Sequence, residues 1–339
     1  MSVLTGSLLS TGCASEIRPV ADGGGGGPEA SVQIDGRTPD APLPDSRIDG
    51  PAVDAAAPAD AAIVADTARP CGLVVGENKN FTIGGRSRRF FIELVNVPSG
   101  HAKPLPVVFA YHYLGGTPED FRKATVPSPA NKPFILAMPA AVDKTKFPMW
   151  DFKTDPATSV DLKFFDEMLV CLSRQFTIDT NRIHAMGFSM GAQWINYLVA
   201  HRGDLLASFA QASGGVLSLA KTDPNYFECP MTTLLGKLAK KPAGLVAWGG
   251  ANDKSDTYSF HQGSLDAIKL YHDSGHFLVR CTHAYAHNWP PDDFTKFILM
   301  FFEDHPKGVN PEPYVLGLPK QTPFSGPYPS WPTWCAAVP

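Results

Sequence analysis

The sequence lacks several features that would assign the protein to a particular class. It has no run of about 18 apolar residues, so no segment is long enough for a membrane-spanning helix. The formal net charge is -4, so there is no basic excess of the kind that nucleic-acid binding requires. The six cysteines include no C-x-x-C pair, which argues against a zinc or redox centre built on cysteine. No internal repeat is visible.

The charge that is present is distributed unevenly. Residues 14–70 carry ten Asp/Glu and four Arg, a net of -6, so the remaining residues sum to about +2 (-4 minus -6). This segment is rich in Gly, Ala, Pro and Asp and includes the run Gly23–Gly27. It cannot bury enough apolar surface to offset the entropy of ordering. We therefore expect residues 14–70 to form a flexible acidic linker.

The first residues are small and apolar and end in Leu9-Ser10-Thr11-Gly12-Cys13. This resembles the tail of a bacterial lipoprotein signal, with residues 1–13 as the export segment and Cys13 as the lipidated residue. No Lys or Arg precedes the apolar run, and Ser10 stands where Leu is usual, which leaves open a start codon upstream. We expect an extracellular or cell-surface protein that meets the membrane only through this lipid.

Residues 71–339 alternate between strand and helix patterns. Alternating apolar residues around Gly84-Gly85 predict a β-hairpin. Apolar runs predict buried strands at 105–112, 134–138, 183–186, 206–212, 245–248 and 276–281. Apolar spacing predicts helices at 161–176, directly after Ser189, and at 294–302. These elements indicate an α/β domain with a mostly parallel sheet covered on both faces, followed by an irregular Pro-rich strap from residue 306 onward.

The pentapeptide Gly187-Phe188-Ser189-Met190-Gly191 lies between a predicted strand and a predicted helix. A G-x-S-x-G sequence in that setting is a nucleophile elbow, in which the serine sits on a strained turn. Gly187 and Gly191 are explained if a Cβ at either position would collide with the neighbouring strand or helix. The start of the helix, with its free N–H groups, favours developing negative charge. Ser189 is therefore the predicted nucleophile.

A serine hydroxyl needs a base, and in this architecture the acid and then the histidine follow along the chain. Asp253 is the first carboxylate after the 245–248 strand, with Asp256 as the alternative. His287 and His283 both follow the last predicted strand, and we favour His287 because His283 could simply cap that strand. Their spacing could also suggest a metal site, but no H-E-x-x-H pattern is present, so we expect no metal.

An oxyanion hole needs backbone N–H groups aimed at the tetrahedral intermediate. Met190 should supply one, and Leu114 the other, with Tyr113 as the neighbour that could replace it. His112 is better explained as a structural residue that orders this loop. Aromatic residues that could line a substrate pocket are Tyr113, Trp150 and Trp289, although large aromatics are more often core residues.

These motifs together resemble the secreted polyhydroxybutyrate depolymerase and feruloyl or acetylxylan esterase group of α/β-hydrolases, from about Phe81 to His305. The family's H-G-x-G-x-T loop is similar to His112–Thr117, with Tyr113 in place of the first Gly. Its H-G-T-x-D acid loop is similar to Trp248–Asp253, with Trp for His and one extra residue. Its G-H-x-W-P matches Ala286–Pro290, which strengthens the choice of His287 over His283.

The resemblance implies a serine esterase that transfers an acyl group from an ester substrate, which can be a polymer, to water without a cofactor. We expect a monomer. A serine peptidase of the prolyl-oligopeptidase type shares the fold and triad but usually carries a propeller for which this chain has no room. A catalytically silent surface binding protein would commonly have lost a triad residue. If Cys13 carries lipid, five cysteines remain, allowing at most two disulfides of undetermined connectivity.

Overall fold

The computed structural model describes residues 70–125, 132–144, 147–216, 231–255, 258–290, 294–318 and 331–338. The expected export segment with Cys13 lies outside these residues, and so does the expected linker except for its last residue, Pro70. No helix within the described ranges is long and apolar enough to cross a membrane.

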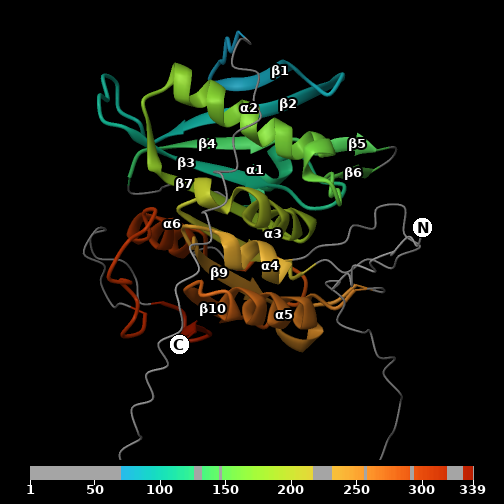
Figure 1. The fold of residues 1–339 in the computed structure, drawn as a ribbon, viewed down its shortest axis with the longest axis vertical. Helices are drawn as coiled ribbons and strands as arrows, with labels where there is room; N and C mark the ends of the chain where they lie inside the picture. The colour runs from blue at the N-terminus through green and yellow to red at the C-terminus, as the bar shows by residue number, and fades with distance from the viewer. Residues whose placement is uncertain are drawn as a thin grey trace, which may run out of the picture.

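A nine-stranded sheet forms the centre of the molecule (Figure 1). Its strands, in spatial order, are β1 (Gly76–Ile83), β2 (Arg86–Val95), β4 (Phe134–Pro139), β3 (Leu105–Tyr111), β7 (Ile178–Phe188), β8 (Ser208–Ala212), β9 (Ala243–Trp248), β10 (Leu278–Thr282) and β11 (Cys335–Val338). The six strands from β4 to β10 in this order are parallel to one another. At the edges, β2 pairs antiparallel with both β1 and β4, and β11 pairs antiparallel with β10. The predicted mostly parallel sheet and the hairpin at its edge are confirmed.

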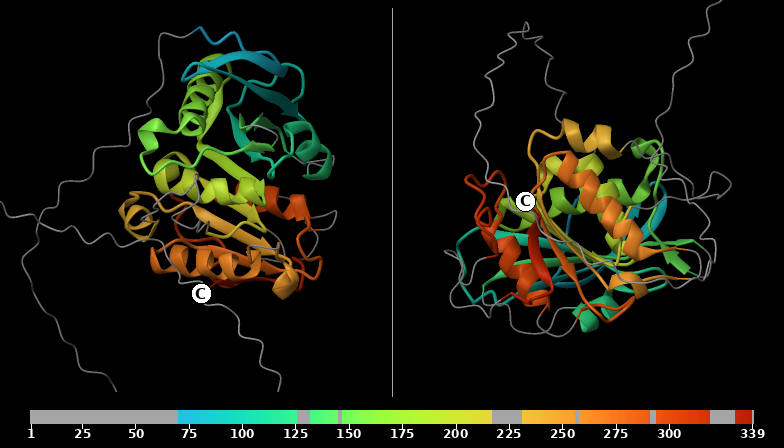
Figure 2. Two further views of the ribbon diagram at one scale, coloured as in Figure 1. Left: turned by 90° about the vertical axis from the view of Figure 1, so that its right-hand side faces the viewer. Right: turned by 90° about the horizontal axis from the view of Figure 1, so that it is seen from below.

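Helices cover both faces of this sheet (Figure 2). On one face lie α2 (Val160–Gln175), α3 (Met190–Arg202), α4 (Met231–Lys237) and α5 (Phe260–Asp273). On the other lie α1 (Pro118–Thr125) and α6 (Phe294–Asp304). The buried apolar side chains accordingly form two clusters, one on each side of the sheet. A small second sheet pairs β5 (Val142–Lys144) with β6 (Phe147–Met149).

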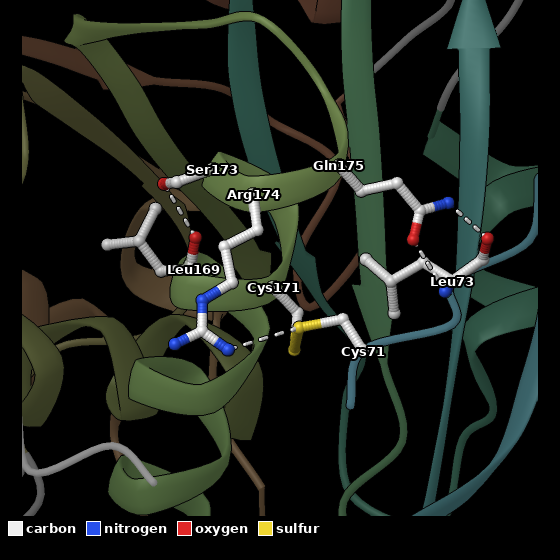
Figure 3. The surroundings of a disulfide bond; sticks show 7 residues. All are labelled: Cys71, Leu73, Leu169, Cys171, Ser173, Arg174 and Gln175. Atoms are coloured by element: carbon white, nitrogen blue, oxygen red, sulfur yellow. Dashed lines mark hydrogen bonds between the residues drawn. A yellow bond between two sulfur atoms is a disulfide. The ribbon is translucent and has the colours of Figure 1, made fainter. Parts of the chain in front are cut away.

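The predicted helix at 161–176 corresponds to α2. Its N-terminus is capped by Ser159, whose hydroxyl accepts a hydrogen bond from the Leu162 N–H at 3.2 Å. A disulfide joins Cys171 in this helix to Cys71, and the Gln175 amide hydrogen-bonds both the N–H and the carbonyl of Leu73 (Figure 3). These contacts fix the start of the described domain against α2.

The C-terminal segment differs from the predicted irregular strap. It ends in β11, which pairs with β10 and is joined to it by a second disulfide, Cys281–Cys335. Tyr314 and Trp331 are buried in the core cluster that includes α6. The two disulfides agree with the predicted maximum, while Cys229 lies outside the described residues.

Candidate active site

Ser189 occupies the sharp turn between β7 and α3. Its backbone has φ 53° and ψ -122°, a region that costs a non-glycine residue about 1–3 kcal/mol. The turn is held by hydrogen bonds from the Ser189 N–H to the Ala212 carbonyl (2.9 Å) and from the Gln193 N–H to the Ser189 carbonyl (3.0 Å). The surrounding sheet and helix thus maintain the strained geometry that is typical of a nucleophile elbow.

The two glycines that flank this turn permit close backbone packing. A Cβ on Gly187 would lie 2.7 Å from the Gly191 carbonyl carbon, at the start of α3. A Cβ on Gly191 would lie 2.1 Å from the Tyr111 carbonyl oxygen, at the end of β3. The predicted reason for both glycines is confirmed, and the β3 exit loop is consequently brought against the elbow.

Asp253 is fully buried beyond the end of β9. Its Oδ2 accepts hydrogen bonds from the Ser213 hydroxyl (2.6 Å) and the Gly249 N–H (2.8 Å), and its Oδ1 faces His287. Burial raises the pKa of this carboxyl, but the hydrogen bonds from His287, Gly249 and Ser213 outweigh burial and lower the pKa below its ordinary value. The carboxylate is therefore ionised at neutral pH.

His287 lies in the loop between β10 and α6, where it joins Ser189 to Asp253. Its Nδ1 is 2.7 Å from Asp253 Oδ1, and its Nε2 is 3.0 Å from Ser189 Oγ. Because the ionised Asp253 can only accept, Nδ1 carries the proton, and Nε2 is left to accept the serine hydroxyl proton. The structure thus brings together the serine, histidine and aspartate that the sequence predicted.

The alternative histidine is turned away from this chain of hydrogen bonds. His283 Nδ1 accepts the Tyr285 N–H at 3.2 Å, and its ring packs against Trp334. Burial lowers the pKa of His283 to about 4, so it stays neutral. Asp256, the alternative acid, lies outside the described residues.

The loop expected to form the oxyanion hole follows β3. His112 orders it: Nδ1–H donates to the Tyr113 carbonyl (2.8 Å), and Nε2 accepts the Ala141 N–H (3.0 Å). Burial lowers the pKa of His112 to about 4, which fits a neutral structural residue. The Leu114 N–H has no hydrogen-bond partner among the described residues, and Met190, first in α3, has no intrahelical partner for its own N–H.

Two of the three predicted pocket aromatics lie beside the elbow. The half-buried Tyr113 and Trp289 each make an edge contact with the Phe188 ring, at centroid distances of 6.0 and 6.2 Å. Trp150 is different: only 2% of it is exposed, its indole N–H donates to the His112 carbonyl at 2.9 Å, and its ring stacks on Trp194. Trp150 therefore belongs to the core and supports the His112 loop instead of lining a pocket.

Three residues near the triad were not singled out from the sequence. Ser213 holds Asp253, and Phe188 and Phe260 stack on His287. Ser213 could have been found, because polar residues at the carboxyl ends of parallel strands gather at one edge and it directly follows β8. Within the described ranges, no group of three or more His, Cys, Asp or Glu residues could hold a metal ion.

The parallel strand order, the elbow after β7 and the site at the carboxyl edge of the sheet define an α/β-hydrolase fold. The crystal structure of native sOPH aligns with a TM-score of 0.56 at 19% identity, covering 79% of this chain and 96% of that one. Native pOPH also aligns at 0.56, with 17% identity over the same shares. The predicted fold class is confirmed.

Sequence comparison adds one curated relative, oxidized polyvinyl alcohol hydrolase from Sphingopyxis sp. (strain 113P3). It is 22% identical over 198 residues, which cover 50% of this chain and 54% of that protein. The aligned part therefore spans about half the length of the relative. No family model matches the chain.

Proposed function

We propose that the protein is a serine hydrolase that cleaves carboxylic esters through an acyl-enzyme. The observation that carries this proposal is the unbroken chain of hydrogen bonds from Ser189 Oγ through His287 to Asp253. The strained turn that presents the serine and the ionised state of the acid support it. The name of the curated relative, a hydrolase, points in the same direction.

In this mechanism Ser189 Oγ attacks the ester carbonyl while His287 Nε2 takes the hydroxyl proton. The carbonyl oxygen, now negative, accepts hydrogen bonds from the N–H groups of Met190 and Leu114. His287 then returns the proton to the leaving alcohol as the acyl-enzyme forms. A water, deprotonated by His287, releases the acid and restores the serine. Asp253 holds the Nδ1–H tautomer and stabilises the imidazolium throughout.

Tyr113 and Trp289 both contact Phe188, the residue before Ser189. This arrangement supports an acyl site with aromatic walls. Such walls accept either the hydroxyalkanoate units of a polyester or feruloyl and acetyl groups on a polysaccharide. We further propose that the protein is exported and tethered by lipid at Cys13, because disulfides are typical of oxidising compartments and two are present. Replacing Cys13 by Ser should then move the protein from the membrane fraction to the medium.

The test is steady-state turnover of p-nitrophenyl acetate, p-nitrophenyl butyrate, methyl ferulate and oxidised polyvinyl alcohol by the full chain. Wild type should hydrolyse at least one ester, and Ser189→Ala should lower kcat by several orders of magnitude. The ratios between substrates rank aliphatic against aromatic acyl groups. Turnover of peptide p-nitroanilides alone would replace the proposal with a peptidase, and no turnover by the folded wild type would favour a silent binding protein.

A further inference from the structure

His287 is the triad residue with the least regular backbone support. It lies in the loop between β10 and α6, whereas Ser189 is fixed between a strand and a helix. Its polar contacts, with Asp253 and Ser189, lie in the plane of the ring and do not restrain the ring's two faces. The side chain is nevertheless only 29% exposed. Something other than the triad must therefore cover the imidazole.

Two phenyl rings cover it. The Phe260 ring lies 3.9 Å from the imidazole, centroid to centroid, with 24° between the planes. The Phe188 ring lies 5.0 Å away with 28° between the planes. No ring contact joins the two phenyl groups to each other. Phe188 packs against the core cluster on the α6 side of the sheet, whereas Phe260 begins α5, which lies on the opposite face. The two phenyl rings therefore reach the imidazole from different sides, and we infer that it is sandwiched between them.

We propose that Phe188 and Phe260 form an aromatic clamp that orients His287 and stabilises the imidazolium formed when it takes the serine proton. Both are positioning residues, since neither reaches the reacting atoms. The proposal rests on the proposed esterase function, because the imidazolium arises during that reaction.

Each side of the clamp is fixed to another part of the triad. Phe188 directly precedes Ser189 and pairs with Ala212 of β8 at the end of β7. Phe260 is the first residue of α5, and the N–H of the next residue, His261, donates to the Asp253 carbonyl at 3.0 Å. Phe188 is therefore fixed relative to Ser189, and Phe260 is fixed relative to Asp253. By packing on the imidazole, the two rings hold His287 in position relative to both.

The electrostatics favour the charged form of the imidazole between these rings. The face of a phenyl ring is negative, and a cation over it is stabilised more strongly as water is removed. Among the described residues, the charged group that faces the imidazole is Asp253. His261 on α5 accepts the Trp248 indole N–H, and His283 in the same loop accepts the Tyr285 N–H, so neither bonds to the imidazole.

The experiment replaces Phe260 with mono-, di- and trifluorophenylalanine, which keep the shape of the ring but progressively weaken its negative face. We expect kcat for the ester substrate to fall along the series, by about 2- to 30-fold in total, with KM almost unchanged. The acid limb of the kcat/KM profile should move to lower pH in the same order. A role in packing alone would leave both readouts flat, which would overturn the clamp.

Phe302 supplies the matched control. Its ring stacks on the buried His184, with 4.7 Å between the centroids and 8° between the planes, on the face of the sheet opposite to α5. Fluorination there should not change turnover. A readout without substrate is the NMR titration of the His287 ring in Ser189→Ala protein, whose midpoint should also move to lower pH along the Phe260 series. If wild type hydrolyses no ester, the proposed function fails, and this titration still decides the clamp.

Discussion

Ser213 and Asp253, 40 residues apart in the chain, are joined by a 2.6 Å hydrogen bond from the serine hydroxyl to Oδ2 of the carboxylate. The opposite oxygen, Oδ1, serves His287 at 2.7 Å. The carboxylate is thus held by Ser213, directly after β8, and itself holds His287, in the loop after β10. Ser213 has φ 49°, so its backbone is also in a conformation that few non-glycine residues adopt.

We predict that Ser213→Ala lowers kcat about tenfold, because a hydrogen bond to a charged group contributes about 1.5 kcal/mol and its loss lets the carboxylate turn. Ser264→Ala is the matched control: its hydroxyl is equally buried but has no hydrogen-bond partner among the described residues. The measurement is kcat for each variant on the preferred ester. Equal values for the two variants would show that Ser213 does not orient Asp253.

Asp253→Asn keeps the shape of the acid but should lower kcat by about 10⁴, as the amide can donate to Nδ1 and favour the wrong histidine tautomer. The fall should appear in kcat with the folded state retained, which circular dichroism and urea denaturation can verify. Activity within tenfold of wild type would instead direct attention to Asp256.

The elbow glycine Gly191 should not tolerate a methyl group. The new Cβ would lie 2.1 Å from the Tyr111 carbonyl oxygen, so β3 or α3 must shift. We expect Gly191→Ala to lower the free energy of unfolding by more than about 3 kcal/mol and to abolish turnover. Gly236→Ala in α4, where no atom lies within 4 Å of the added Cβ, should be neutral or stabilising. Urea denaturation of both variants is the comparison.

Stability should fall as the solution is acidified from about pH 6.5 towards pH 4. Burial lowers the pKa of His112, His201, His276 and His283 to about 4. Burial also lowers the pKa of His184 well below its ordinary value. Below pH 6.5 the unfolded chain binds protons that the native protein does not, so the folded state loses up to about 3 kcal/mol per histidine. Denaturant midpoints at pH 7.5, 6 and 5 measure this, and equal midpoints would contradict it.

The Cys281–Cys335 disulfide closes a loop of 54 residues and joins β10 to β11 directly before the His287 loop. Removing it with Cys281→Ala/Cys335→Ala should lower the free energy of unfolding by about 4 kcal/mol, through restored freedom of the unfolded chain. The measurement is urea denaturation of this variant beside wild type under oxidising conditions. An unchanged midpoint would show that strand pairing alone holds β11.

The strand–turn–helix around Ser189 was predictable because its signals are local: an apolar strand, two glycines and an apolar helical stripe. The helix α5 was not predicted, since its buried side includes the small residues Gly263, Ser264 and Ala267, which give no hydrophobic periodicity. β11 was missed for a similar reason. Its residues Cys335–Val338 follow a Pro-rich stretch, and only pairing with β10 makes them a strand.

The order of the triad along the chain could be inferred, and so could the loops that carry it, because parallel strands place their carboxyl ends at one edge. The supporting contacts could not, because they depend on tertiary packing. Trp150 illustrates this: the sequence offered it as a pocket residue, yet stacking on Trp194 buries it in the core. Phe260 illustrates the reverse, since a helix that the sequence concealed delivers its ring to His287.

The two disulfides also set how the domain would respond to mechanical tension applied through residues 70 and 338. A pull would pass from Cys71 directly to Cys171 and from Cys281 directly to Cys335. Only the 109 residues between Cys171 and Cys281 (172–280) could extend, by at most about 400 Å. That stretch contains Ser189 and Asp253, whereas His287 stays within the cross-linked C-terminal loop. Stretching would therefore part the base from its two partners while leaving both ends of the domain covalently closed.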